Sequence, residues 1–159
     1  QPQAIKKMID AVQQNPVMDV ITPVINLRWS ELDKLREQKK VTPFSGTTCI
    51  RDQDEKALWF SKTIIPAIRE EENLRDSEYS PVFQHIGLYG YKVEVLHKFV
   101  SWPQGYYETL EGLEQLRFLE NNVAVHTIQI DVPAGLAQAG IDSPEDIERA
   151  EKLLTDIRT

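Results

Sequence analysis

Residues 17–27 read VMDVITPVINL, and this run decides the fold of the chain. It is almost unbroken in apolar and β-branched residues, which is the pattern of a strand buried on both faces. Helical patterns and further β-branched runs alternate around it. That alternation predicts an α/β layered fold with a partly parallel sheet, because a strand buried on both sides needs cover on both sides.

The elements on either side of this strand are predicted from their start and stop signals. Pro2 opens an amphipathic helix that ends near Gln14, and SELD at residues 30–33 has the form of a capping box that opens a short helix. Residues 47–50 and 57–60 are expected to form a hairpin. The remaining predicted elements are a charged solvated loop at 70–79, strands at 85–91 and 123–130, and helices at 93–100, 106–121 and 143–158.

Size and charge limit the classes of function. The 159 residues fit one domain, and the net charge of −7 argues against broad binding to nucleic acid or to an anionic membrane surface. An anionic ligand would need a local cluster of cations or a metal ion. No apolar run approaches the length of a membrane span, and the single Cys49 excludes an internal disulfide and favours a reducing cytoplasm.

Three motifs stand in order along the chain: FQHIGLYGY at 83–91, LEQLR at 113–117 and GIDSPED at 140–146. Together they resemble the C-terminal part of the CMP-KDO synthetases, the bacterial 3-deoxy-manno-octulosonate cytidylyltransferases. That family transfers CMP from CTP to an acidic 2-keto-3-deoxy sugar for the inner core of lipopolysaccharide and releases pyrophosphate. The resemblance implies a nucleotidyltransferase-like, Rossmann-like mixed sheet, Mg²⁺ as cofactor, a cytoplasmic location and a homodimer.

The resemblance also implies that part of the family's fold is missing. The family's N-terminal strands, its phosphate-holding loop and the metal-binding aspartate of a Gly-Asp-Glu-Pro motif would all precede Gln1. Residues 1–159 are therefore expected to be a single partial α/β domain. The expectation is that this chain on its own does not turn over substrate.

The resemblance implies that two pairs of residues line a pocket for the acidic sugar. His85 and Tyr89 stand where the family lines its acidic-sugar pocket, although a lone strand histidine is by default a structural residue. Glu114 and Gln115 match the family residues that hydrogen-bond the sugar hydroxyls, and an amide suits a polyol because it both donates and accepts. Arg117 is interpreted as an ion-pair partner, and the acids at 108 and 111 as a solvated helix face.

Lys62 and Asp142 complete the predicted site. FSKTIIP at 60–66 matches the family's Phe-Ser-Arg-x-x-Ile-Pro with lysine for arginine, which keeps the charge and loses the two-pronged grip on a carboxylate. Asp142 precedes a helix start, where a capping role is the simplest interpretation. The resemblance instead makes Asp142 a ligand of the catalytic Mg²⁺.

Two sets of alternatives stay open. The reaction could use an amino-octulosonate or a nonulosonate, since Lys62 and a longer segment at 133–138 depart from the family, or the domain could be a non-catalytic sugar-binding or dimerisation remnant. Residues 41–66 are predicted to project as an antiparallel dimerisation element, because Leu58, Trp59 and Phe60 make one strand apolar on both faces. Alternatively, those side chains pack under the chain's own helices.

Overall fold

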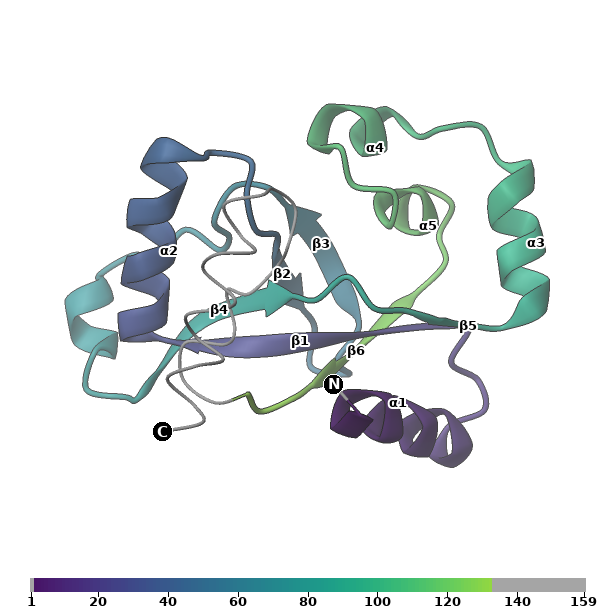
Figure 1. Ribbon diagram of the computed structural model, residues 1–159, viewed down its shortest axis with the longest axis horizontal. Helices are drawn as coiled ribbons and strands as arrows, with labels where there is room; N and C mark the ends of the chain where they lie inside the picture. The colour runs from purple at the N-terminus through teal and green to yellow at the C-terminus, as the bar shows by residue number, and fades with distance from the viewer. Residues whose placement is uncertain (1, 133–159) are drawn as a thin grey trace.

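Strand β1 (Val20–Arg28) is the centre of the sheet, as its apolar sequence predicts. The computed structural model describes residues 2–132, and Figure 1 shows β1 running through the middle of them. β1 pairs antiparallel with β4 (Tyr79–His85) and β5 (Gly90–Tyr91), and parallel with β6 (Val125–Gln129). The mixed sheet of an α/β fold is thereby confirmed for the described residues.

Helices cover both faces of this sheet. On one face lie α1 (Pro2–Gln14) and α2 (Trp29–Val41), which bury Ala4, Leu32 and Leu35. On the other lie α3 (Val93–Ser101), α4 (Tyr106–Glu111) and α5 (Leu116–Glu120), which contribute Leu116 and Phe118 to a second core. Figure 1 shows α1 and α5 on opposite sides of β1. The sheet therefore has two separate apolar layers, as a strand buried on both faces requires.

The start of α2 differs from the prediction. The helix begins at Trp29, directly after the end of β1, so the SELD segment lies inside it. The backbone N–H of Arg28 donates to the Glu31 carboxylate at 2.9 Å, and this contact replaces the predicted cap at Ser30. The shift arises because Arg28 still has extended backbone angles and joins strand to helix without a loop.

The single long helix predicted for residues 106–121 is wrong. α4 ends at Glu111, and Gly112 adopts a left-handed conformation with φ of 63° that closes the helix before α5 begins. After the break Leu110 lies on the outside, and 63% of its surface is exposed. Leu113 and Leu116, by contrast, are buried.

The predicted strand at 85–91 is also divided. His85 is the last residue of β4 rather than the first residue of a strand, and the chain turns before it forms β5. A Cβ atom on Gly90 would lie 2.9 Å from Cγ2 of Ile21. Gly90 therefore allows β5 to pack closely on β1.

The predicted hairpin is present as β2 (Thr48–Arg51) and β3 (Ala57–Ser61). β2 also pairs with β4, so the hairpin extends the main sheet. Phe60 is fully buried in the core, and the Trp59 ring packs edge-on against Tyr107 of α4, as the alternative interpretation expects. Leu58 is 56% exposed. The role of residues 41–66 in dimerisation stays a prediction.

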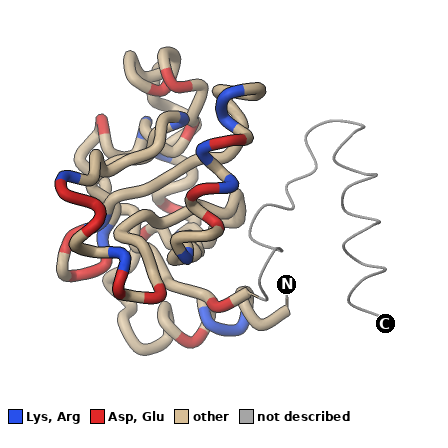
Figure 2. The backbone as a smooth tube through the Cα atoms, turned by 90° about the vertical axis from the view of Figure 1, so that its left-hand side faces the viewer, with Lys and Arg blue, Asp and Glu red and all other residues tan. Residues whose placement is uncertain are grey.

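The charged segment at residues 70–79 is bound to the fold, although the sequence predicts a solvated loop. It contains a short 3-10 helix, η1 (Glu71–Leu74). Arg36 of α2 donates to the Glu71 carboxylate at 2.9 Å, and Arg75 bridges to Asp33 at 2.8 Å. Figure 2 marks acidic and basic positions close to one another along the backbone. No described helix is long and apolar enough to cross a membrane.

Candidate functional site

His85 and Tyr89 lie side by side on the face of the sheet that carries α5. Their ring centroids are 5.4 Å apart, and Tyr89 stacks on Tyr91 at 5.5 Å. Tyr91 in turn stacks on Phe118 of α5. Because side chains alternate along an extended segment and Gly90 faces α1, its two tyrosine neighbours face the opposite way. The turn after β4 thus directs both tyrosine rings toward α5.

Charged residues surround this pair. Lys62 follows the last residue of β3, and its ammonium group is close enough to lower the pKa of His85. Glu114 precedes α5, and its negative charge contributes to the raised pKa values of both Tyr89 and Tyr91. Gln115 is the neighbour of Glu114 and is buried. We call Lys62, His85, Tyr89, Glu114 and Gln115 the His85 cluster; the sixth predicted site residue, Asp142, lies outside the described residues.

His85 is neutral at pH 7. Burial, followed by the nearby charge of Lys62, lowers its pKa from 6.5 to about 4. The hydroxyl of Thr22 donates to the carbonyl of Leu88 at 2.8 Å and lies 3.0 Å from Nε2 of His85. Since that hydroxyl has only one proton, the contact with His85 is satisfied by an Nε2–H donor. Nδ1 of His85 is then the unprotonated nitrogen and a hydrogen-bond acceptor.

Two buried polar atoms of the His85 cluster have no hydrogen-bond partner among the described residues. They are the hydroxyl oxygen of Tyr89 and Nε2 of Gln115. Leaving such a group unpaired costs about 1–3 kcal/mol, so each position calls for an explanation. A polar ligand that reached these atoms would supply the missing hydrogen bonds.

The chemistry of the His85 cluster suits binding better than covalent catalysis. Burial raises the pKa of the Tyr89 hydroxyl, which stays protonated, and His85 with a pKa of about 4 is a weak base at neutral pH. Cys49 lies nearby, but burial raises the pKa of its thiol to about 12 and makes it a poor nucleophile. Donors and acceptors on His85, Tyr89 and Gln115, with the ammonium of Lys62 and the carboxylate of Glu114 near them, are groups that bind a hydroxylated, acidic molecule.

Metal binding finds no support within residues 2–132. In that range no three His, Cys, Asp or Glu side chains are grouped so that they could hold a metal ion. The predicted Mg²⁺ ligand Asp142 lies beyond it. Mg²⁺ binding therefore stays a prediction.

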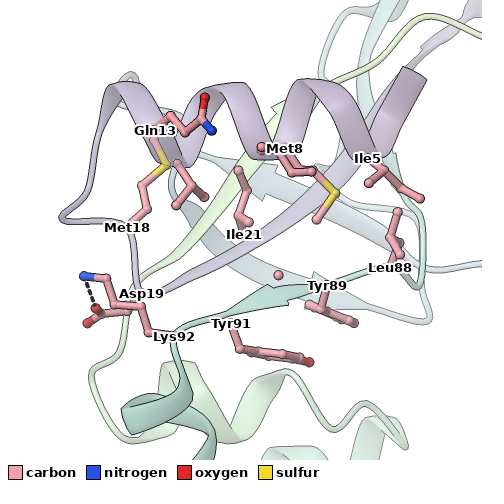
Figure 3. Close-up of a pocket in the computed structure, with 13 residues that line it drawn as sticks. Ile5, Met8, Gln13, Met18, Asp19, Ile21, Leu88, Tyr89, Tyr91 and Lys92 are labelled. Atoms are coloured by element: carbon pink, nitrogen blue, oxygen red, sulfur yellow. Dashed lines mark ion pairs between the residues drawn. The ribbon is translucent and has the colours of Figure 1, made fainter. Parts of the chain in front are cut away.

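A hollow lies between α1 and strands β1 and β5, on the face of the sheet opposite α5 (Figure 3). Its volume is about 410 Å³, and its walls include Met8, Ile21 and Tyr89, the last of which also belongs to the His85 cluster. An ion pair between Asp19 and Lys92, 3.0 Å long, lies at its rim. These walls are mostly apolar and would disfavour an acidic sugar. We call this hollow the α1 groove; the sequence patterns did not predict it.

Sequence reasoning missed three residues that shape the site. Glu108 and Glu111 are not a solvated face: Glu108 is buried against Arg117, whose predicted role as an ion-pair partner is confirmed. Glu111 accepts hydrogen bonds from the segment that carries Lys62. Thr22, which sets the tautomer of His85, is the one hydroxyl side chain in the apolar run at 17–27, and that interruption was the available signal.

Known proteins resemble this chain over nearly its whole length. A 3-deoxy-manno-octulosonate cytidylyltransferase from Maricaulis maris (strain MCS10) is 33% identical over 153 residues, covering 96% of this chain and 57% of the relative. The enzyme of the same name from Thermodesulfovibrio yellowstonii is 36% identical over 146 residues, covering 86% and 54%. The chain thus spans about half the length of the curated relatives that it matches.

A solved structure confirms the fold. The structure of CMP:2-keto-3-deoxy-manno-octonic acid synthetase complexed with CTP superimposes with a TM-score of 0.75 and 22% identity, over 98% of this chain and 57% of that one. At that identity the likeness concerns the fold alone. The cytidylyltransferase family model matches residues 1–130. This match, together with the two relatives, shows that the chain belongs to the cytidylyltransferase family.

Proposed function

We propose that this chain supplies the acidic-sugar site of an enzyme that transfers CMP from CTP to 3-deoxy-D-manno-octulosonate and releases pyrophosphate. The observation that carries the proposal is the pair of buried, unpartnered polar atoms on Tyr89 and Gln115, with the charge of Lys62 acting on His85 beside Tyr89. The names of the two relatives point to the same sugar. The cofactor Mg²⁺, the homodimer, the cytoplasmic location and the place in lipopolysaccharide synthesis remain parts of this proposal.

Each group of the His85 cluster has a role in this proposal. The ammonium of Lys62 attracts the sugar carboxylate, while the carboxylate of Glu114, the amide of Gln115 and the hydroxyl of Tyr89 bind sugar hydroxyls. Nδ1 of His85 accepts from a further hydroxyl. In the transfer, the anomeric hydroxyl oxygen loses its proton to solvent and forms a bond to the α-phosphorus of CTP, and the bond from that phosphorus to the pyrophosphate oxygen breaks. The cluster would contribute alignment to this direct attack.

Isothermal titration calorimetry of the chain with 3-deoxy-manno-octulosonate tests the assignment. We expect saturable binding of this sugar and none of a neutral sugar such as mannose at the same concentration. Absence of binding by any 2-keto-3-deoxy acid, even after a family N-terminal segment is supplied, would show that the substrate is wrong.

Replacing Lys62 with methionine is expected to weaken the binding of 3-deoxy-manno-octulosonate about thirtyfold. The variant keeps most of the side-chain length but loses a charged hydrogen bond, which is worth about 1.5–3 kcal/mol. Lys34→Met, at an exposed position of α2, is the matched control and should bind as the unmodified chain does. Equal affinities for the Lys62→Met and Lys34→Met variants would contradict the role of Lys62.

The identity of the sugar can be narrowed with the same assay. Lysine in place of the family's arginine loosens the geometry at the carboxylate, which leaves room for an amino-octulosonate or a nonulosonate such as sialic acid. Comparing the dissociation constants of the three sugars ranks them directly. Pyrophosphate release with CTP and Mg²⁺ separates an enzyme from a binding remnant, and we expect none from this chain alone.

A further inference from the structure

The backbone of Lys62 is held from two sides by charged side chains. Its N–H donates to Oε2 of Glu111 at 2.8 Å, and its carbonyl accepts from Nζ of Lys39 at 2.6 Å. β3 ends at Ser61, so Lys62 lies just beyond the regular part of the strand. Two side chains from distant helices therefore fix the peptide groups on both sides of this residue.

All three protons of the Lys39 ammonium are donated in hydrogen bonds to backbone carbonyls. Besides the carbonyl of Lys62, its ammonium donates to the carbonyls of Ser45 and Gly46 at 2.6 and 3.0 Å. An ammonium has three protons, and these three short contacts account for them. Burial, with a further contribution from Lys62, lowers the pKa of Lys39. A half-buried ammonium with its protons occupied serves as an anchor and has no proton left for a ligand.

Glu111 is similarly occupied. Its Oε1 atom accepts from the hydroxyl of Ser61 at 2.8 Å, while Oε2 accepts from Lys62. Glu111 is the last residue of α4, and the left-handed Gly112 that follows ends the helix at that point. The helix end thus directs a carboxylate at the segment after β3. Among the hydrogen bonds of the described residues, this carboxylate reaches the His85 cluster through the backbone of Lys62.

We propose that Lys39 and Glu111 are positioning residues that clamp the backbone of Lys62 and thereby hold its ammonium beside His85. The inference rests on the proposed function, since it takes Lys62 to be the group that binds the sugar carboxylate. Lysine has a flexible stem with a compact charge, so a fixed backbone limits the volume that the charge can sample. Pre-organisation of this kind lowers the entropy cost of binding.

A double-mutant cycle tests the clamp. Glu111→Ala and Lys39→Met are each expected to weaken the binding of 3-deoxy-manno-octulosonate about tenfold in calorimetry. In the Lys62→Met background neither change should weaken binding further, because the residue through which they act is gone. The controls are Glu37→Ala and Lys40→Met, which break an exposed ion pair on α2 and should leave the affinity unchanged. Thermal unfolding of every variant confirms that it is folded.

Two results would overturn the clamp: an unchanged affinity in the folded Glu111→Ala variant, or the same tenfold loss with and without Lys62. Amide hydrogen exchange gives a measurement that needs no sugar. The Lys62 amide should exchange at least about tenfold faster in the Glu111→Ala variant than in the Glu37→Ala variant. If the unmodified chain binds no sugar, the proposed substrate fails, and this exchange rate alone decides the clamp: equal rates reject it.

Discussion

Replacing Glu108 with alanine is expected to destabilise the protein by about 3–5 kcal/mol, because it leaves a largely buried arginine without its partner. Two hydrogen bonds join the Glu108 carboxylate to the Arg117 guanidinium, and the side chains are only 5% and 17% exposed. The same carboxylate accepts the backbone N–H of Gly105 at the start of α4. Urea unfolding at pH 7 measures the loss of free energy.

Two controls test whether the loss of stability comes from the Glu108–Arg117 ion pair itself. Glu94→Ala removes an exposed acid from the first turn of α3 and should change the free energy of unfolding by less than about 0.5 kcal/mol. Replacing both partners, with Glu108→Leu and Arg117→Met, should cost less than Glu108→Ala alone, since no buried charge is left unpaired. A double variant less stable than the single one would show that the unpaired arginine is not the main cause of the destabilisation.

Acidification is expected to remove about 3 kcal/mol of stability through His85 alone. Its pKa is about 4 in the folded state and 6.5 as an ordinary histidine. Between these values the unfolded chain binds a proton that folded His85 does not, so stability is complete above pH 6.5 and falls as the pH drops toward 4. The slope within this window should approach about 1.4 kcal/mol per pH unit.

The difference between the unmodified chain and the His85→Gln variant isolates this contribution. His126 also has a lowered pKa because of burial and adds a slope of the same sign, which the subtraction removes. Urea unfolding at pH 7.0, 6.0 and 5.5 gives both curves. Parallel pH profiles for the two proteins would mean that His85 is protonated as readily in the folded state as in the unfolded one.

The sequence predicts this fold well where one signal dominates. β1 and α1 follow from an apolar run and an amphipathic period, and the hairpin follows from two short strands around a polar turn. Predictions failed where local and long-range effects competed. Gly112 interrupts an otherwise helical pattern, and a glycine in such a pattern can either lie within the helix or end it. In this structure Gly112 adopts a left-handed conformation and ends the helix.

The hydrophobic pattern of the sequence predicts less of the candidate site than of the fold. His85, Tyr89 and Gln115 are identified by family motifs, while their burial, and the missing partners of Tyr89 and Gln115, come from the packing of α5 against the turn after β4. Glu111 shows the limit most clearly. Its sequence neighbours suggest a solvated acidic face, yet it contacts Ser61 and Lys62, which lie about 50 residues earlier. No local pattern encodes a contact between a helix end and a distant strand end.

The central claim is that the sugar site is the His85 cluster, and chemical-shift mapping tests it most directly. On adding millimolar 3-deoxy-manno-octulosonate to the isotope-labelled chain, we expect the largest changes at Lys62, His85, Tyr89 and Gln115. Ile9 and Val12 of the α1 groove, on the opposite face of the sheet, should not change. Changes confined to Ile9, Val12 and the other residues of α1, or none anywhere, would contradict the account.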